Sequence, residues 1–416
     1  MNVLRDPDFR RLLGAHVVSQ VGSGVTLLAL PLIAALDLGA TPFQVGLLAA
    51  SETVPLLLLG LLAGVWADRR RRRPLMVATD LGRAVVLLAI PLAAWQGWLR
   101  FDLLVAVSVV AGTLSVVFDI AAQSYLPSLV PAAGLVQANS LMHSSYSVGG
   151  IAGPALAGVL IQTLRAPFAV AADAVSFLVS GLLLGGIRRP EPEPIAGGEA
   201  RSVRADLGEG LRFVRDTPIL RALGLSTGVW NLFDNMRQAM LVLFCARTLG
   251  MGPGLLGLVY AVASVGYLVG TFLPAPAARR LGLGRAVLLG ALLVLPGDVL
   301  VALAGGPPTV AAAMVGGGMF LSGLAGPVYD VNQFSLRQSI TPRRMQGRVA
   351  ATLRVLIRGT VPVGALLGGA LAGVVGLRGV MWVGLLGVPL ALLLVWLSPV
   401  PGVRVLPEMA EDAGSA

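Results

Sequence analysis

Apolar stretches long enough to cross a lipid bilayer recur along the whole chain, with short polar loops between them. A membrane-spanning helix needs about 20 consecutive, predominantly apolar residues. Charged residues make up only 12% of the 416 residues, whereas a typical soluble domain has about 25%. We therefore predict an all-α membrane protein with twelve transmembrane helices. Their expected ranges are 10–36, 43–66, 74–96, 102–126, 137–163, 166–187, 219–247, 254–278, 285–304, 308–336, 347–374 and 379–398.

One long interruption separates the sixth and seventh helices. Its first part, RRPEPEPIAGGEARS, has the Pro- and Gly-rich composition of a linker. The following VRADLGEGLRFVRD spaces Val203, Leu207, Leu211 and Val214 at helical intervals, which predicts an amphipathic helix on the membrane surface. The expected organisation is a helical bundle over 1–187, a cytoplasmic linker over 188–218, a second bundle over 219–398 and a cytoplasmic tail over 399–416.

The distribution of arginine predicts the orientation of the chain. Loops on the side of the N-terminus carry twenty-two arginines, and the opposite loops carry only Arg100, Arg165, Arg247 and Arg378. Cytoplasmic loops of membrane proteins are enriched in basic residues. We therefore expect a multi-pass protein of the cytoplasmic membrane with both termini in the cytoplasm.

The two halves of the sequence repeat with a constant offset of 211 residues. The offset aligns Pro7 with Pro218, Pro42 with Pro253, Asp119 with Asp330, Gly153 with Gly364 and Gly158 with Gly369. Because each half has six helices, an even number, both halves enter the membrane from the same side. This arrangement is a parallel repeat, and it places the expected transport pathway between the two halves.

A basic loop follows the second predicted helix, in the stretch GVWADRRRRRPL at 64–75. Gly64, Asp68, Arg69, Arg72 and Arg73 match the signature that the major facilitator superfamily carries between its second and third helices. Twelve helices, a parallel repeat and a long central loop are also similar to that superfamily. A nucleic-acid-binding patch is excluded because this short loop lies between two spanning helices.

A second motif lies in the fifth predicted helix. Gly149, Gly153, Pro154 and Gly158 resemble the pattern of proton antiporters in the superfamily, with Ala157 in place of one glycine. Small residues allow close helix approach, and the proline permits a bend. The stretches 118–141, 340–349 and 362–379 resemble the branch that exports drugs, macrolides and siderophores of the enterobactin type.

Charged residues within spanning helices are functional candidates because they are costly there. Asp234 and Arg237 share one face of the seventh helix at an i,i+3 spacing, with Asn231 one turn earlier. The resemblance implies that this helix lines the transport cavity, where Asp234 would bind a proton in exchange for substrate. A permanent structural ion pair is the alternative. Further cavity candidates are Gln20, which aligns with Asn231 under the offset, and the aromatic residues Trp230, Phe233 and Tyr260.

Glu52 in the second helix is the other proton-coupling candidate, since it has no basic neighbour in the sequence. The alternative is a carboxyl group that hydrogen-bonds to a neighbouring helix or lies near the outer headgroups. Asp173 and Asp298 fall toward the outer ends of helices 6 and 9, and we interpret them as snorkelling or outer-gate residues.

The remaining charges are expected to form a cytoplasmic gate network together with the arginines of the basic loop. Its further members are Asp80, Arg83, Asp119, Asp330, Arg348 and Arg354. The resemblance implies that Asp68 faces the start of helix 11 near Arg348 in one access state only, which would bias the equilibrium between states. Static anchoring of the loops is the alternative.

The sequence offers no case for an enzyme. It has no Walker loop for ATP, and two histidines with one cysteine are too few for a metal site. We expect no cofactor, no nucleic-acid partner and a monomeric state. The predicted function is a secondary active transporter that exports amphiphilic small molecules, such as drugs, macrolide-like natural products or siderophores, in exchange for protons. The alternatives are an importer, a lysolipid flippase, or a sensor of the same fold that transports nothing.

Overall fold

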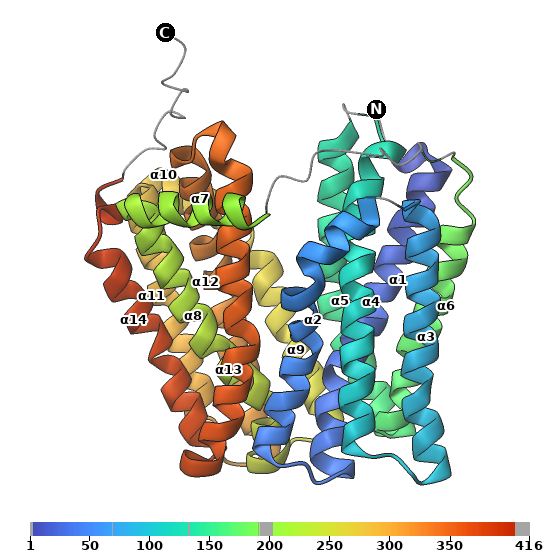
Figure 1. The fold of residues 1–416 in the computed structure, drawn as a ribbon. Helices are drawn as coiled ribbons and strands as arrows, with labels where there is room; N and C mark the ends of the chain where they lie inside the picture. Colours follow the sequence, from blue (N-terminus) through green and yellow to red (C-terminus); the bar gives the residue numbers. More distant parts are fainter. Residues whose placement is uncertain (1–2, 69, 132–133, 190, 192–202, 404–416) are drawn as a thin grey trace. The chain divides into compact units, whose positions relative to one another are not determined.

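The computed structural model describes residues 3–68, 70–131, 134–189, 191 and 203–403, without the side chains of 58–68, 203–207 and 343. Every element in these ranges is helical, as Figure 1 shows. The predicted all-α class is therefore confirmed.

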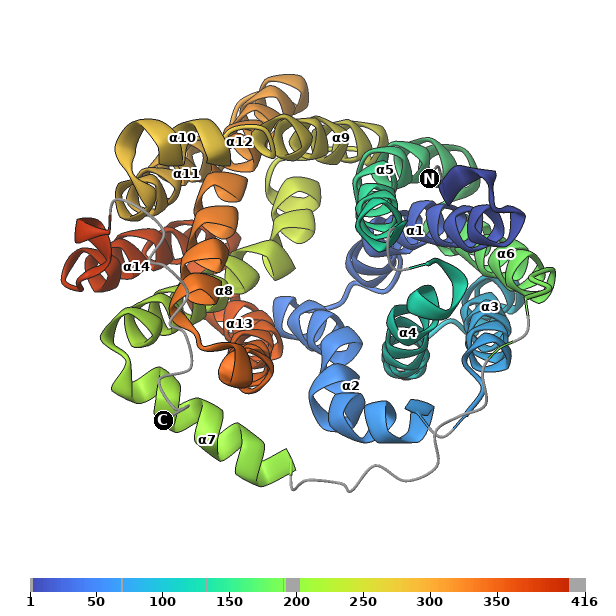
Figure 2. The same ribbon diagram turned by 90° about the horizontal axis from the view of Figure 1, so that it is seen from above.

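Six long helices make up the first half of the chain. Their bounds are α1 (Pro7–Leu32), α2 (Pro42–Asp68), α3 (Arg72–Gln96), α4 (Phe101–Leu129), α5 (Leu135–Leu164) and α6 (Ala166–Gly185). The start of α1 follows from local chemistry, because Pro7 occupies the first turn and the Asp6 carboxylate accepts a hydrogen bond from the N–H of Asp8 at 2.8 Å. In Figure 2, α1 lies beside α5 and α6, and α4 lies between α2 and α3.

The second half contains the amphipathic helix and a further set of long helices. Their bounds are α7 (Val203–Asp216), α8 (Pro218–Leu243), α9 (Pro253–Gly270), α10 (Pro274–Leu281), α11 (Leu283–Leu303), α12 (Pro308–Ile340), α13 (Arg343–Leu385) and α14 (Gly387–Trp396). The single helix expected at 254–278 is divided into α9 and α10, because Pro274 has no N–H to continue the hydrogen bonds of α9 and instead occupies the first turn of a new helix.

The element α13 contains two successive helices. Gly376 has φ 73° inside it, a conformation that an L residue rarely adopts and that ends the first helix. The chain turns there and continues through the remainder of α13 into α14 (Figure 1). The two helices expected at 347–374 and 379–398 are thus present.

Nine segments of the described chain have the length and hydropathy to cross a bilayer. The last of them, Arg344–Trp396, contains the turn at Gly376 and therefore provides two crossings. Counting α2 and α8, which are of similar length, gives the predicted number of twelve.

The repeat of 211 residues is visible in the backbone itself. Helix α1 ends in the π-helical turn η2 (Ile33–Asp37), and α8 ends in the π-helical turn η4 (Phe244–Thr248), at the same offset. The next glycines, Gly39 and Gly250, have φ of 61° and 64°. Two helical halves of the same design are therefore confirmed at the level of single residues.

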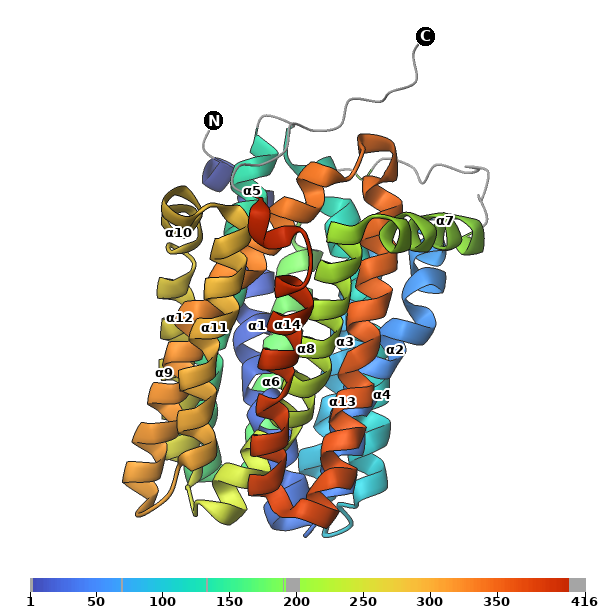
Figure 3. The ribbon, with the colours of Figure 1, turned by 90° about the vertical axis from the view of Figure 1, so that its left-hand side faces the viewer.

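Helix α7 packs against the first turns of α13. Figure 3 shows α7 lying across the end of α13. Val214 is buried in a cluster with Met345, Val349 and Leu353, and Glu209 pairs with Arg348 at 2.6 Å. Leu211 is exposed. The predicted amphipathic helix exists, but its apolar residue Val214 is covered by protein and not by a membrane surface.

The chain divides into two compact units by its internal contacts. Unit 1 contains Met1–Gly198 and Val242–Ala261, and unit 2 contains Glu199–Leu241 and Val262–Ala416. The end of α8 and the start of α9 thus belong to unit 1, although the sequence repeat assigns them to the second half. The expected division into 1–187 and 219–398 stays a prediction about which parts move together.

Candidate functional site

Three charged side chains from two helices meet inside unit 2. Arg237 on α8 donates from Nη2 to Oδ1 of Asp234 at 2.7 Å, and the same nitrogen lies 3.2 Å from Oδ1 of Asp298 on α11. Ser322 on α12 donates from Oγ to the same Asp298 oxygen at 2.9 Å. We call the three charged residues Asp234, Arg237 and Asp298, together with the supporting Ser322, the acidic triad site, because two of the three charges are carboxylates.

The acidic triad site is buried on one side and open on the other. The side chains of Arg237 and Asp298 are each 6% exposed, whereas that of Asp234 is 33% exposed. On α13, a Cβ atom at Gly384 would lie 2.9 Å from Cβ of Arg237, so α13 approaches closely here. Two carboxylates against one guanidinium leave one negative charge in excess. Such an excess charge is costly inside a membrane.

The predicted snorkelling of Asp298 is wrong, whereas its role in an outer gate stays a prediction. Its side chain is buried and bonded to α8 and α12. Sequence analysis missed these contacts because no basic residue lies near Asp298 in the sequence. A usable signal was the preceding Gly297, which packs against the carbonyl of Gly318 and against Ser322 on α12. A glycine of this kind marks a close helix contact and therefore a buried environment.

The other candidates on α8 differ from one another in the groups that they contact. Asn231 donates to the carbonyl of Thr227 at 2.9 Å within its own helix. Trp230 packs on Tyr329 at 4.6 Å between ring centroids, within the apolar core of unit 2. Phe233 contacts α14 at Gly387 and lies beside Gly384. Trp230 is thus engaged in packing, while the cavity roles of Asn231, Phe233 and the half-buried Tyr260 stay predictions.

The glycine motif of α5 allows two other helices, α1 and α9, to approach α5 closely. A Cβ atom at Gly149 would lie 2.7 Å from Cβ of Gln20, and one at Gly153 would lie 2.7 Å from Cα of Gly24, both on α1. Gly158 faces α9 instead, where its Cβ would lie 3.2 Å from Cα of Gly257. Small residues therefore serve close helix packing, as expected, and Gln20 lies at the contact of α1 with α5.

Glu52 lies half-buried in the middle of α2. A Cβ atom at Gly112 of α4 would lie 2.6 Å from its carbonyl oxygen, so the two helices are in close contact at this level. No residue within the described ranges forms an ion pair with Glu52. Its role in proton coupling stays a prediction.

A second buried charge cluster lies in unit 1. Arg83 forms an ion pair with Asp80 on the same helix, and Ser180 of α6 donates to Asp80 at 2.6 Å. The guanidinium lies between the rings of Phe118 and Phe177, at 4.6 and 4.1 Å from their centroids. The contacts that Asp80 and Arg83 make are therefore with α4 and α6, and their expected connection to the loop arginines stays a prediction.

Asp173 on α6 is also buried, which contradicts its predicted snorkelling and leaves its role in an outer gate a prediction. Its Oδ2 accepts a hydrogen bond from Thr26 of α1 at 2.5 Å, and Ser176 lies 3.1 Å from Oδ1. The neighbouring α1 residue is Gly22, where any Cβ atom would collide with Ser176. The absence of a side chain at Gly22 thus makes room for these polar groups.

The arginines of the basic loop contact the start of the linker. Glu191 accepts the backbone N–H of Arg72 at 2.5 Å and of Arg73 at 3.2 Å, and Arg73 Nε donates to the carbonyl of Leu184 at 3.1 Å. Gly64 lies within α2. The side chain of Asp68 and all of Arg69 lie outside the described residues, so the contact expected between Asp68 and α13 stays a prediction. Asp119, Asp330 and Arg354 are exposed, and Arg348 pairs with Glu209.

Comparisons with known proteins bear on the whole chain. The sequence model of the Major Facilitator Superfamily matches residues 12–237. The chain is 30% identical over 387 residues to the multidrug efflux pump Tap of Mycolicibacterium fortuitum, over 88% of this chain and 90% of that protein. It is 27% identical over 391 residues to the multidrug efflux pump Tap of Mycobacterium tuberculosis (strain ATCC 25618 / H37Rv), over 91% of this chain and 90% of that protein.

Solved structures resemble the fold closely at low sequence identity. A bacterial homologue of the iron transporter ferroportin in its inward-facing state gives a TM-score of 0.76 at 18% identity, over 95% of this chain and 99% of that chain. The nucleoside transporter NupG gives 0.71 at 12% identity, over 95% of this chain and 98% of that chain. At such identities the likeness concerns the arrangement of helices alone.

Proposed function

Because this chain belongs to the major facilitator superfamily, we propose that it is a transporter that exports amphiphilic small molecules in exchange for protons. The multi-pass membrane fold and the transporter relatives support movement of a small molecule across a bilayer. The 30% identity to a multidrug efflux pump, over 88% of the chain, favours export of varied toxic compounds.

The observation that carries proton coupling is the shared guanidinium nitrogen of Arg237. Asp234 and Asp298 lie 2.7 and 3.2 Å from it, so each carboxylate competes with the other for one cation. A proton bound to one carboxyl group removes the excess charge. A cationic or hydrogen-bonding substrate that approaches the partly exposed Asp234 favours the charged carboxylate and hence release of the proton.

The exchange follows from this competition between proton and substrate. Substrate binds where Asp234 is accessible and displaces the proton, and the protein then changes its access state. A proton from the other side replaces the substrate. Alternating access between two halves around one site is the general mechanism of transporters with this repeat.

Flux in everted membrane vesicles tests the proposal. An imposed proton gradient, acidic inside, should drive uptake of ethidium or of another compound to which the protein gives resistance in cells. Asp234→Asn and Asp298→Asn should abolish gradient-driven uptake while the protein still binds the compound. Asp102→Asn is the matched control, because Asp102 is 69% exposed beside Arg100 and should transport normally.

The same assay decides between the alternatives. Uptake that the proton gradient does not stimulate contradicts antiport. Accumulation into whole cells identifies an importer, and flux of a labelled lysolipid alone identifies a flippase. Unchanged flux in both aspartate variants contradicts the role of the acidic triad site.

A further inference from the structure

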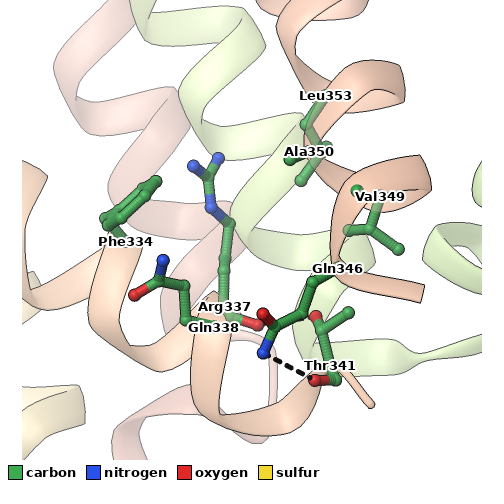
Figure 4. A pocket seen from close by; sticks show the side chains of 9 residues that line it. Phe334, Arg337, Gln338, Thr341, Gln346, Val349, Ala350 and Leu353 are labelled. Carbon is green, nitrogen blue, oxygen red and sulfur yellow. Dashed lines mark hydrogen bonds between the residues drawn. The ribbon is translucent and has the colours of Figure 1, made fainter. Parts of the chain in front are cut away.

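A pocket of about 280 Å³ lies within unit 2, between the end of α12 and the first turns of α13. Figure 4 shows Arg337 rising from α12 into it, with Phe334 on one side and Ala350 and Leu353 on the other. The pocket is separate from the acidic triad site, whose members are not among its lining residues. The proposed function does not use it.

Arg337 forms no direct ion pair in the part of the chain that the structure describes, where Asp330 on the same helix is an acidic group that acts on it from a longer distance. Its Nη1 atom is buried without a hydrogen-bond partner there. The guanidinium lies 5.5 Å from the ring centroid of Phe334, a contact that leaves the edge donors of the guanidinium unused. A guanidinium is a planar fork of donors that suits the oxygens of phosphates and carboxylates. Arg337 is therefore equipped to bind an anion.

The remaining lining residues specify which anion fits. None of them is acidic, and Gln338 and Gln346 add neutral polar groups at the rim. Val349, Ala350 and Leu353 form an apolar wall beside the cation. A charged group next to an apolar wall matches a ligand that is anionic at one end and hydrocarbon at the other.

The position of the pocket points to the bilayer as the source of this ligand. Arg337 lies in the last turn of α12, and Arg344 follows in the first turn of α13. The distribution of arginine predicts that this end of the two helices faces the cytoplasm. Anionic phospholipids are concentrated at that membrane surface, and basic pockets between transmembrane helices bind their headgroups.

We propose that this pocket is a binding site for an anionic phospholipid. Arg337 pairs with the headgroup phosphate, Gln338 and Gln346 offer hydrogen bonds to it, and an acyl chain lies along Ala350 and Leu353. The bound lipid supplies the direct anionic partner that Arg337 lacks and connects the end of α12 to the start of α13.

Lipid binding by the purified full-length chain tests the proposal. Native mass spectrometry and thermal unfolding are measured in detergent with added phosphatidylglycerol or phosphatidylcholine. The wild type should retain at least one phosphatidylglycerol and unfold at a higher temperature with it, with no such effect of phosphatidylcholine. Arg337→Gln should weaken the apparent affinity about tenfold or more, as expected for loss of a charge-assisted contact. Arg280→Gln, an exposed arginine on α10, should bind as the wild type does.

A second variant keeps the test decisive if Arg337→Gln fails to fold. Ala350→Phe fills the pocket and leaves every charge in place, so it should also lose the retained lipid. Equal retention of phosphatidylglycerol and phosphatidylcholine by the wild type would overturn the proposal. So would full retention in Ala350→Phe, or stabilisation by inorganic phosphate alone that equals the effect of the lipid. These binding readouts do not depend on flux, so they stand apart from the test of the proposed function.

Discussion

At the scale of single residues, the central feature of the acidic triad site is one guanidinium nitrogen that contacts two carboxylates. Nη2 of Arg237 serves Asp234 and Asp298 together, and Ser322 donates a further hydrogen bond to Asp298. Breaking a buried charge cluster by removing its cation leaves both carboxylates uncompensated. In the proposed exchange, Arg237 is thus a positioning residue that holds the two acids within reach of one proton.

Replacement of the buried arginine in unit 1 should destabilise the protein without any effect specific to transport. Arg83→Gln leaves Asp80 buried without its ion pair and empties the space between Phe118 and Phe177. Removal of one partner from a buried pair costs about 3–5 kcal/mol. We expect a markedly lower unfolding temperature, followed with a thiol-reactive dye that reports exposure of the buried Cys245.

The control for this prediction is an exposed ion pair in the same unit. Arg100 is 75% exposed beside Asp102, and a surface pair contributes only about 0–1 kcal/mol. Arg100→Gln should therefore unfold close to the wild-type temperature. Equal unfolding temperatures for Arg83→Gln and Arg100→Gln would show that the Arg83 pair is not a structural element.

At the scale of helices, the repeat reproduces one packing arrangement twice. Gly153 of α5 contacts α1 at Val21 and Gly24. Gly364 of α13, at the matching position, contacts α8 at Leu232 and Asn235, which match Val21 and Gly24 in turn. Close approach of the two helices is thus encoded by one glycine in each half.

A methyl group added at one of these closely packed glycines should lower the stability of the protein, whereas one added at an open position should not. In Gly153→Ala the new Cβ would lie 2.7 Å from Cα of Gly24, a backbone atom that cannot move aside. We expect a loss of about 1–3 kcal/mol from overpacking. In Gly359→Ala nothing lies within 4 Å, so better helix propensity should add up to about 1 kcal/mol.

Thermal unfolding of the two alanine variants measures this difference. The unfolding temperature should fall for Gly153→Ala and should rise or stay unchanged for Gly359→Ala. A fall of similar size in both variants would mean that loss of glycine flexibility, and not close helix contact, is responsible.

For the whole molecule, the sequence predicts those features that are encoded locally. Apolar runs determine the twelve crossings, and Pro7, Pro42 and Pro253 mark helix starts. The offset of 211 residues predicts the repeat, and the structure adds the matching π-helical turns at Ile33–Asp37 and Phe244–Thr248. These features depend on the chain's own order of residues and need no knowledge of neighbours in space.

Features that depend on neighbours distant in sequence were not predictable in the same way. Asp298 has its partners on α8 and α12, and Asp173 has one on α1. Their burial follows from helix packing, which one sequence alone does not specify. For the candidate site, the pair Asp234 and Arg237 was evident from its i,i+3 spacing, whereas the third charge required the structure.

The central claim is that proton and substrate compete for the acidic triad site. The direct measurement is the pH change when ethidium, or the best compound from a resistance screen, is added to purified protein in a weakly buffered solution. The wild type should release protons in proportion to the compound bound, and Asp102→Asn should do the same. The variant with both Asp234→Asn and Asp298→Asn should bind the compound and release none. Undiminished proton release by that double variant would contradict the account.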